Sequence, residues 1–210
     1  MLRCGRPCKA QLWTPRHEPF LLIHCSIAGS DSTSGALRAI FYFLMKHPAK
    51  MERLTQEIND AFLDSRLTSP VQYKQATKLP YLMAVIQESL RLFPPFGVPM
   101  PRYVPDGGLQ LFSHHIPAGF KIGMNAMVTQ FDESVFGEDA QEFRPERWLV
   151  DDAQYRAMQK AMLVFGAGTR TCIGKHVSVD NWGHFGVAFT DDGAVRSFRM
   201  RRCIRWCRRY

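Results

Sequence analysis

Residues 165–174, which read FGAGTRTCIG, restrict what this chain can fold into more than any other segment. Gly166 and Gly168 are one residue apart, and glycine lets the backbone adopt conformations closed to other residues and approach a flat ligand closely. Cys172 follows where a helix could begin, and the free amide groups at a helix start favour a thiolate, as does the charge of Arg170. The segment therefore predicts a loop that presents Cys172 as a metal ligand or a nucleophile. The alternative from these residues alone is a glycine-rich turn with a buried structural cysteine.

Apolar residues that recur three and four positions apart predict that most of the chain is helical. The longest such pattern runs from Glu18 to about Lys46 and contains the small polar segment 28–35, AGSDSTSG. Glycines and hydroxyls inside a helix lower its stability by on the order of a few kcal/mol together relative to alanine. The presence of this segment therefore indicates a functional role. The other expected elements are helices at 49–63, 79–93 and 154–164, two or three short strands within 95–125, and irregular structure at 131–150. We therefore expect a mainly α fold with a minor β-sheet.

The net charge of +8 is concentrated at one end of the chain. Residues 195–210 contain seven arginines and no acidic residue, whereas the other 194 residues carry 20 basic and 19 acidic groups. Because a nearly neutral body offers no surface that would follow a phosphate backbone, we expect no nucleic-acid partner. No run of 18 apolar residues occurs, so we expect no membrane-spanning segment, and MLRCGRPCKA is not followed by the apolar stretch of a secretory signal.

The six cysteines do not indicate a disulfide framework, since no secretory signal precedes them. Cys4 with Cys8, and Cys203 with Cys207, have a spacing that a four-thiolate zinc site permits. The two pairs lie in the least patterned segments of the chain, so zinc is an alternative without supporting context.

Taken together, the glycine loop and three earlier segments resemble the cytochrome P450 monooxygenases. The loop matches the family's haem-binding pattern at Phe165, Gly166, Gly168, Arg170, Cys172 and Gly174. Before it come, in the family's order, AGSDST at 28–33, which resembles the oxygen-binding kink of the long central helix, ESLR at 88–91, which matches the Glu-x-x-Arg motif, and FRPERW at 143–148, which is similar to the Pro-Glu-Arg segment. Each of these three motifs alone is weak evidence for the family, but four motifs in the family's order are strong evidence. The resemblance covers about residues 26–179 and implies the C-terminal part of the catalytic domain of a truncated fungal-type member, with a partial cytochrome P450 fold.

The resemblance implies haem b as the cofactor, with Cys172 as the axial thiolate ligand of its iron. Phe165 would pack near the sulfur, and Gly166 and Gly168 would let the loop approach the porphyrin. Arg170 and Arg102 are expected to pair with the haem propionates, since a guanidinium group forms charge-assisted hydrogen bonds with a carboxylate.

For the Glu-x-x-Arg segment, the residues alone and the family resemblance predict different degrees of burial. Glu88 and Arg91 are three positions apart and lie on one helical face, which by itself predicts a solvated ion pair. The resemblance implies instead a buried structural network of Glu88, Arg91 and Arg147, in which removal of one partner would be costly.

The small polar segment of the first helix is expected to carry the catalytic side chains. The resemblance places Asp31 and Ser32 above the iron, where an acid beside a hydroxyl relays protons to bound dioxygen, and Thr33 could substitute for Ser32 only if the helix rotates locally. Ser32 stands where the family usually has threonine, which keeps the hydroxyl but loses the methyl group that fixes its rotamer. The alternative is a helix with a few exposed hydroxyls.

These residues imply an oxidoreductase that inserts one oxygen atom of O₂ into a small apolar organic substrate, in the manner of fungal secondary-metabolism members. Electrons would come from a separate NADPH-dependent reductase, because no G-x-G-x-x-G motif follows a strand. Two alternatives stay open: a non-catalytic remnant that binds haem loosely or not at all, and a basic interaction protein acting through residues 195–210. The resemblance implies the endoplasmic reticulum membrane surface for the intact family type, and the cytoplasm is possible for a chain without the family's anchor.

Family members are more than twice as long as this chain, and the family pattern ends near Val179. From Asp180 onward the sequence has scattered glycines and no helical period. We therefore expect three parts: an irregular segment at 1–17, a partial haem-binding monooxygenase domain at 18–179, and an aberrant, disordered basic tail at 180–210. Our hypothesis is that the tail, and with it segment 1–17, is translated intron or frameshifted sequence, which sequencing the transcript across codon 179 would decide.

Overall fold

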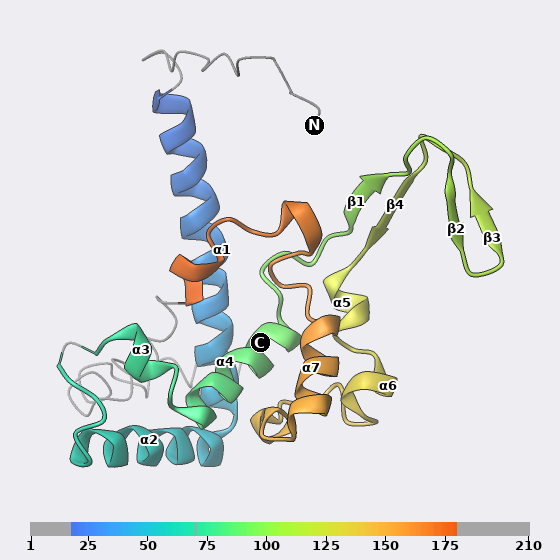
Figure 1. Ribbon diagram of the computed structural model, residues 1–210. Helices are drawn as coiled ribbons and strands as arrows, with labels where there is room; N and C mark the ends of the chain where they lie inside the picture. The colour runs from blue at the N-terminus through green and yellow to red at the C-terminus, as the bar shows by residue number, and fades with distance from the viewer. Residues whose placement is uncertain (1–17, 70, 180–210) are drawn as a thin grey trace, which may run out of the picture.

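The computed structural model describes residues 18–69 and 71–179, and the predictions for 1–17 and 180–210 lie outside this part of the chain. Helices account for most of the described residues, while the strands are short and confined to one stretch (Figure 1). The expected mainly α fold with a minor β-sheet is confirmed. None of the described helices combines the length and the hydropathy that crossing a membrane requires.

The longest element is α1, Glu18–Lys46, and its helical backbone continues through the small polar segment. Within that segment the hydroxyl of Ser32 donates to the carbonyl oxygen of Ala28 at 2.7 Å. A bond of this kind satisfies the hydroxyl inside the helix, so the polar residues are compatible with helical backbone. Further along, α1 turns a stripe of apolar residues into the core, namely Ala36, Ala39, Ile40 and Leu44.

The core of the molecule forms where three helices pack against one another. These helices are α1, α2 (Pro48–Leu63) and α4 (Pro80–Leu92), with the short α3 (Tyr73–Ala76) between the last two. The first turn of α4 is capped from outside, because the carboxylate of Glu57 on α2 accepts the backbone N–H groups of Tyr81 at 2.8 Å and Leu82 at 2.9 Å. A carboxylate at this end of a helix satisfies amides that lack an intrahelical partner and complements the helix dipole. The core residues at the centre of this packing are Leu54, Ile58, Leu79, Leu82, Val85 and Ile86.

Four strands, rather than the two or three expected, follow α4. The antiparallel pairs are β1 (Met100–Tyr103) with β4 (Lys121–Met124), and β2 (Leu109–Leu111) with β3 (His114–Ile116). Figure 1 shows them as an arm that leaves the helical body, with β1 and β4 nearest to it. Most of their side chains are exposed, so the strands contribute little to the core.

Three short helical elements and one longer helix carry the chain from the strands to the glycine loop. They are α5 (Ala126–Thr129), α6 (Glu133–Phe136), the 3₁₀ turn η1 (Pro145–Trp148) and the longer α7 (Asp152–Ala161). A further 3₁₀ turn, η2 (Gly168–Arg170), lies within the loop itself. The helix expected at 154–164 begins two residues earlier than predicted. The reason is Asp151, whose carboxylate accepts the N–H groups of Ala153 at 2.8 Å and Gln154 at 3.0 Å and so fixes the first turn.

Candidate functional site

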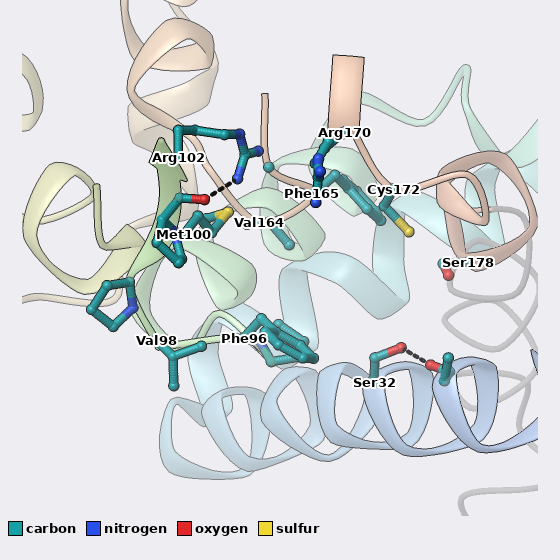
Figure 2. A pocket seen from close by; sticks show the side chains of 15 residues that line it. Ser32, Phe96, Val98, Met100, Arg102, Val164, Phe165, Arg170, Cys172 and Ser178 are labelled. Carbon is teal, nitrogen blue, oxygen red and sulfur yellow. Dashed lines mark hydrogen bonds between the residues drawn. The ribbon is translucent and has the colours of Figure 1, made fainter. Parts of the chain in front are cut away.

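A cavity of about 540 Å³ lies between α1, the segment that leads into β1, and the glycine loop (Figure 2). Its wall is mostly apolar and includes Pro95, Phe96, Val98, Pro99, Met100 and Val164. The polar side chains on the same wall are those of Ser32, Arg102, Arg170, Cys172 and Ser178. A concave apolar site of this size with a few polar groups is the usual form of a small-molecule or cofactor site.

The glycine loop is a closed turn held by its own backbone. The N–H of Cys172 donates to the carbonyl oxygen of Phe165 at 2.8 Å, and the N–H of Gly166 donates to that of Leu163 at 2.9 Å. Gly166 and Gly168 have φ values of +69° and +70°, a region that side chains disfavour. A Cβ atom on Gly166 would also lie only 3.3 Å from the sulfur of Met100. Both glycines are therefore required by the shape of the loop.

Cys172 carries a free thiol that is exposed at the cavity wall. In Figure 2 its sulfur lies on the side of the loop that faces α1, across the cavity from Ser32. Helical backbone begins only at Lys175, three residues later than the position that the sequence suggested for a helix start. The soft sulfur donor thus stands at the edge of an apolar space, with Phe165 beside it on the same loop.

Two guanidinium groups lie on the cavity wall. Arg102 comes from β1 and Arg170 from η2, and both are exposed. Arg102 donates to the carbonyl oxygen of Pro101 at 2.9 Å. Within residues 18–69 and 71–179 no carboxylate lies within ion-pair distance of either arginine. Both charges are consequently available to an anionic group of a ligand.

The residues expected to be catalytic differ in their positions. Ser32 lines the cavity, whereas Asp31 is exposed and does not form part of the wall. Thr33 is half-buried and does not form part of the wall either, although its hydroxyl oxygen lies 3.5 Å from that of Ser178, which does. The structure therefore brings Ser32 together with the cysteine loop and leaves Asp31 and Thr33 beside the cavity. Among the expected loop residues, Gly168 also lies outside the wall.

Glu88, Arg91 and Arg147 form one buried cluster, with Glu88 and Arg91 both 0% exposed. The carboxylate of Glu88 accepts from Arg91 Nε and Nη2, each at 2.9 Å, and from Arg147 Nε at 3.2 Å. The indole N–H of Trp148 and the backbone N–H of Arg144 donate to the same carboxylate at 2.9 and 3.0 Å. All the acceptor positions of a buried charge are thus occupied, as burial requires.

A second carboxylate, Asp139, balances the cluster. Its Oδ1 accepts from Arg147 Nη1 at 2.8 Å, and its carbonyl oxygen accepts from Nη2 at 2.9 Å. The hydrogen bond from Arg147, opposed by partial burial and reinforced by the charges of Arg147 and Arg144, holds the pKa of Asp139 below its ordinary value. Two carboxylates and two guanidiniums give the cluster of Glu88, Asp139, Arg91 and Arg147 no net charge.

Two residues of this region belong to no sequence motif. Asp139 stands in a stretch expected to be irregular, and Gln130 is a single polar residue without a motif. Gln130 is 0% exposed, and its side-chain amide contacts the last turn of α4 and the backbone just before the glycine loop. A buried polar residue of this kind is recognised by its contacts and not by its spacing.

The family model of cytochrome P450 matches residues 21–179 of this chain. The chain is 70% identical over 152 residues to the cytochrome P450 monooxygenase ACRTS1 of Alternaria alternata, an alignment that covers 72% of this chain and 40% of that protein. It is 46% identical over 154 residues to the cytochrome P450 monooxygenase gsfF of Penicillium aethiopicum, which covers 72% of this chain and 30% of the relative. It is 40% identical over 152 residues to pisatin demethylase of Fusarium vanettenii, covering 72% and 29%. The chain thus spans 40% or less of the length of these relatives.

Proposed function

Since the chain belongs to the cytochrome P450 family and has part of its mainly α fold, we propose that it supplies the thiolate side of a haem monooxygenase. The observation that carries the proposal is the position of Cys172: a free thiol on a glycine loop, at the wall of an apolar cavity that also bears two arginines without carboxylate partners among the described residues. Thiol, apolar wall and guanidinium groups are the three chemistries that a haem group with its iron, porphyrin and propionates requires.

The residues present fit haem b. Cys172 would hold the iron through its sulfur, and Arg102 and Arg170 would hold the propionates. The positive φ of Gly166 and Gly168 keeps this part of the loop free of side chains, so its backbone could approach the porphyrin. When bound, haem supplies the redox chemistry that activates O₂, and a thiolate ligand favours cleavage of the O–O bond.

The wall of the cavity would bind and orient the substrate. Phe96, Val98 and Met100 present apolar surface, and none of the described residues that line this cavity is acidic, which supports a small apolar organic substrate. In the overall reaction one oxygen atom of O₂ enters the substrate and the other leaves as water, with two electrons and two protons consumed. We propose that a separate NADPH-dependent reductase donates the electrons and that the reaction belongs to secondary metabolism, and the similarity of the chain to fungal cytochrome P450 monooxygenases supports this proposal.

Ser32 and its neighbours would deliver the protons. The hydroxyl hydrogen of Ser32 is donated to Ala28, so in this rotamer its oxygen can accept a hydrogen bond from a water in the cavity. Asp31 is exposed to solvent, so it would pass protons to that water from outside the cavity. Thr33, which faces Ser178, would take part only after its side chain turned towards the cavity.

Carbon monoxide difference spectroscopy on the reduced, haem-loaded chain tests the proposal. Thiolate ligation gives a Soret band at about 450 nm, and we expect it in the unaltered chain and not in Cys172→Ala. Cys25→Ala, the same substitution outside the loop, is the control and should keep the band. Persistence of the band in Cys172→Ala would show that the ligand is a different residue. Failure of the unaltered chain to give it would favour the non-catalytic remnant.

A further inference from the structure

Gln130 connects the buried charge cluster to the cysteine loop through a single side chain. It stands at the end of α5 and is 0% exposed. Its Nε2 donates to the carbonyl oxygens of Leu90 at 3.1 Å and Arg91 at 2.8 Å, and its Oε1 accepts the backbone N–H of Leu163 at 3.0 Å. Both donors and one acceptor site of the amide are therefore used, each by a backbone group.

On the α4 side these bonds fix Gln130 rigidly. Leu90 and Arg91 belong to the last turn of α4, where carbonyl oxygens have no partner within the helix. Arg91 in turn donates from Nη1 to the backbone carbonyl oxygen of Gln130 at 2.9 Å. Gln130 is thus joined to Arg91 through both its side chain and its backbone, and Arg91 is held by Glu88.

On the loop side the contact reaches the start of the turn that carries the thiol. Leu163 is buried and stands two residues before Phe165. Its carbonyl oxygen accepts the N–H of Gly166, and the carbonyl oxygen of Phe165 accepts that of Cys172. A displacement of the Leu163 peptide would therefore move the base of the loop and, through the Phe165 bond, Cys172.

We propose that Gln130 is a positioning residue that sets the place of Cys172 relative to the iron, by fixing the Leu163 peptide to the rigid end of α4. The inference rests on the proposed haem ligation, because the function of the position is to keep the sulfur bonded to the metal. Groups that orient a metal ligand from behind are worth about 10- to 100-fold in metal affinity. Gln130 acts on Cys172 through the Leu163 peptide and the loop backbone rather than directly, so we expect an effect on haem affinity towards the lower end of that range.

The test compares Gln130→Met with Gln87→Met, each in the full chain. Methionine has a similar length and packs adaptably, so it removes the hydrogen bonds with little change in volume. Gln87 lies on the same α4, and its side-chain amide donates to the hydroxyl of Tyr155 at 2.7 Å, with no hydrogen bond to the loop among the described residues. We expect Gln130→Met to lower haem affinity about tenfold and to move the carbon monoxide band away from about 450 nm. Gln87→Met should keep both properties.

Hydrogen exchange followed by NMR on the haem-free chain provides a second readout. In the unaltered chain the Leu163 amide should be protected, and Gln130→Met should accelerate its exchange, and that of Cys172, about tenfold relative to Gln87→Met. If the unaltered Leu163 amide exchanges like an exposed one, the inference is overturned without any variant, so a Gln130→Met chain that failed to fold would not leave it untested.

The remaining outcomes separate the two proposals. Haem affinity and band position within twofold of the unaltered chain in Gln130→Met would overturn the positioning role and leave the haem function intact. Equal losses in both variants would also overturn it, because general destabilisation would then explain them. An unaltered chain that gives no thiolate band would refute the proposed function, and the exchange data alone would then decide whether Gln130 holds the loop.

Discussion

Replacing Glu88 by glutamine should remove a large share of this protein's free energy of unfolding, although the two side chains have nearly the same shape. The carboxylate of Glu88 accepts five hydrogen bonds, all from N–H donors: two from Arg91, and one each from Arg147, Trp148 and the backbone of Arg144. In Glu88→Gln one of the two oxygens becomes an NH₂ group that faces these donors. The buried cluster also gains a net positive charge, because Arg91 and Arg147 then keep one carboxylate, Asp139, which also pairs with Arg144 at 2.8 Å.

The size of the effect follows from burial. Removing one partner from a buried charge pair costs about 3–5 kcal/mol, since the other charges stay desolvated without compensation. Domains are stable by only about 5–15 kcal/mol, so the loss is a large share of the total. At about 1.4 kcal/mol for each factor of ten, the folded-to-unfolded ratio should fall about 10²- to 10⁴-fold.

Urea denaturation followed by circular dichroism measures this loss, and Glu146→Gln is the matched control. Glu146 also accepts from two cations, Lys50 at 3.3 Å and Arg53 at 2.9 Å, and from the hydroxyl of Tyr81 at 3.1 Å, a bond that the amide oxygen of glutamine can still accept, but its side chain is 36% exposed. Exposed ion pairs are worth about 0–1 kcal/mol, so the control should cost little. A difference between the two variants of less than about 1 kcal/mol would refute the argument from burial.

Two further predictions concern the neighbouring charge and the loop. Because its hydrogen bond with Arg147 lowers the pKa of Asp139 from the ordinary 3.8, the ionised carboxylate stabilises the fold above pH 3.8 and that stabilisation is lost as pH falls through the lower folded-state pKa. Asp139→Asn should therefore cost about 1–3 kcal/mol at neutral pH and progressively less below pH 3.8 in urea titrations, and a difference independent of pH would contradict this. Gly168→Ala should cost about 1–2 kcal/mol because of its positive φ, and Gly166→Ala should cost more, because its Cβ would also press on the sulfur of Met100. Equal melting temperatures for either glycine variant and the unaltered chain would show that the loop relaxes freely.

The long helices of this fold could be predicted because their apolar residues repeat over several turns. The bounds of α1, Glu18–Lys46, agree with the sequence pattern, and α2 and α4 begin within one residue of the expected positions. The four-residue helices α5 and α6 are too short for a period to appear, and 131–150 was consequently expected to be irregular. The start of α7 was misplaced because the capping carboxylate of Asp151 decides it.

The candidate site also contains residues that the sequence predicts and residues that it does not. The loop residues Phe165, Gly166, Arg170 and Cys172 stand in one continuous motif, and the structure places them on one cavity wall. Asp139 and Gln130 hold the cluster and the loop through hydrogen bonds to residues outside their own elements. A single polar residue forms no sequence pattern, so these bonds could not be predicted from the sequence. Ser32, Asp31 and Thr33 are adjacent in sequence, yet a helix turns each neighbour by about 100°, so only one of them faces the cavity.

The buried cluster also bears on the order in which the chain assembles. Among the described residues, every hydrogen-bond partner of the Glu88, Arg91, Arg147 and Gln130 side chains lies between residues 88 and 163, and none comes from α1 or α2. Loop closure over at most 60 residues carries a modest entropic cost, which grows only with the logarithm of length. This stretch can therefore pair its own buried charges without α1 or α2, and its bond to Leu163 joins the start of the thiol-bearing loop to the same unit.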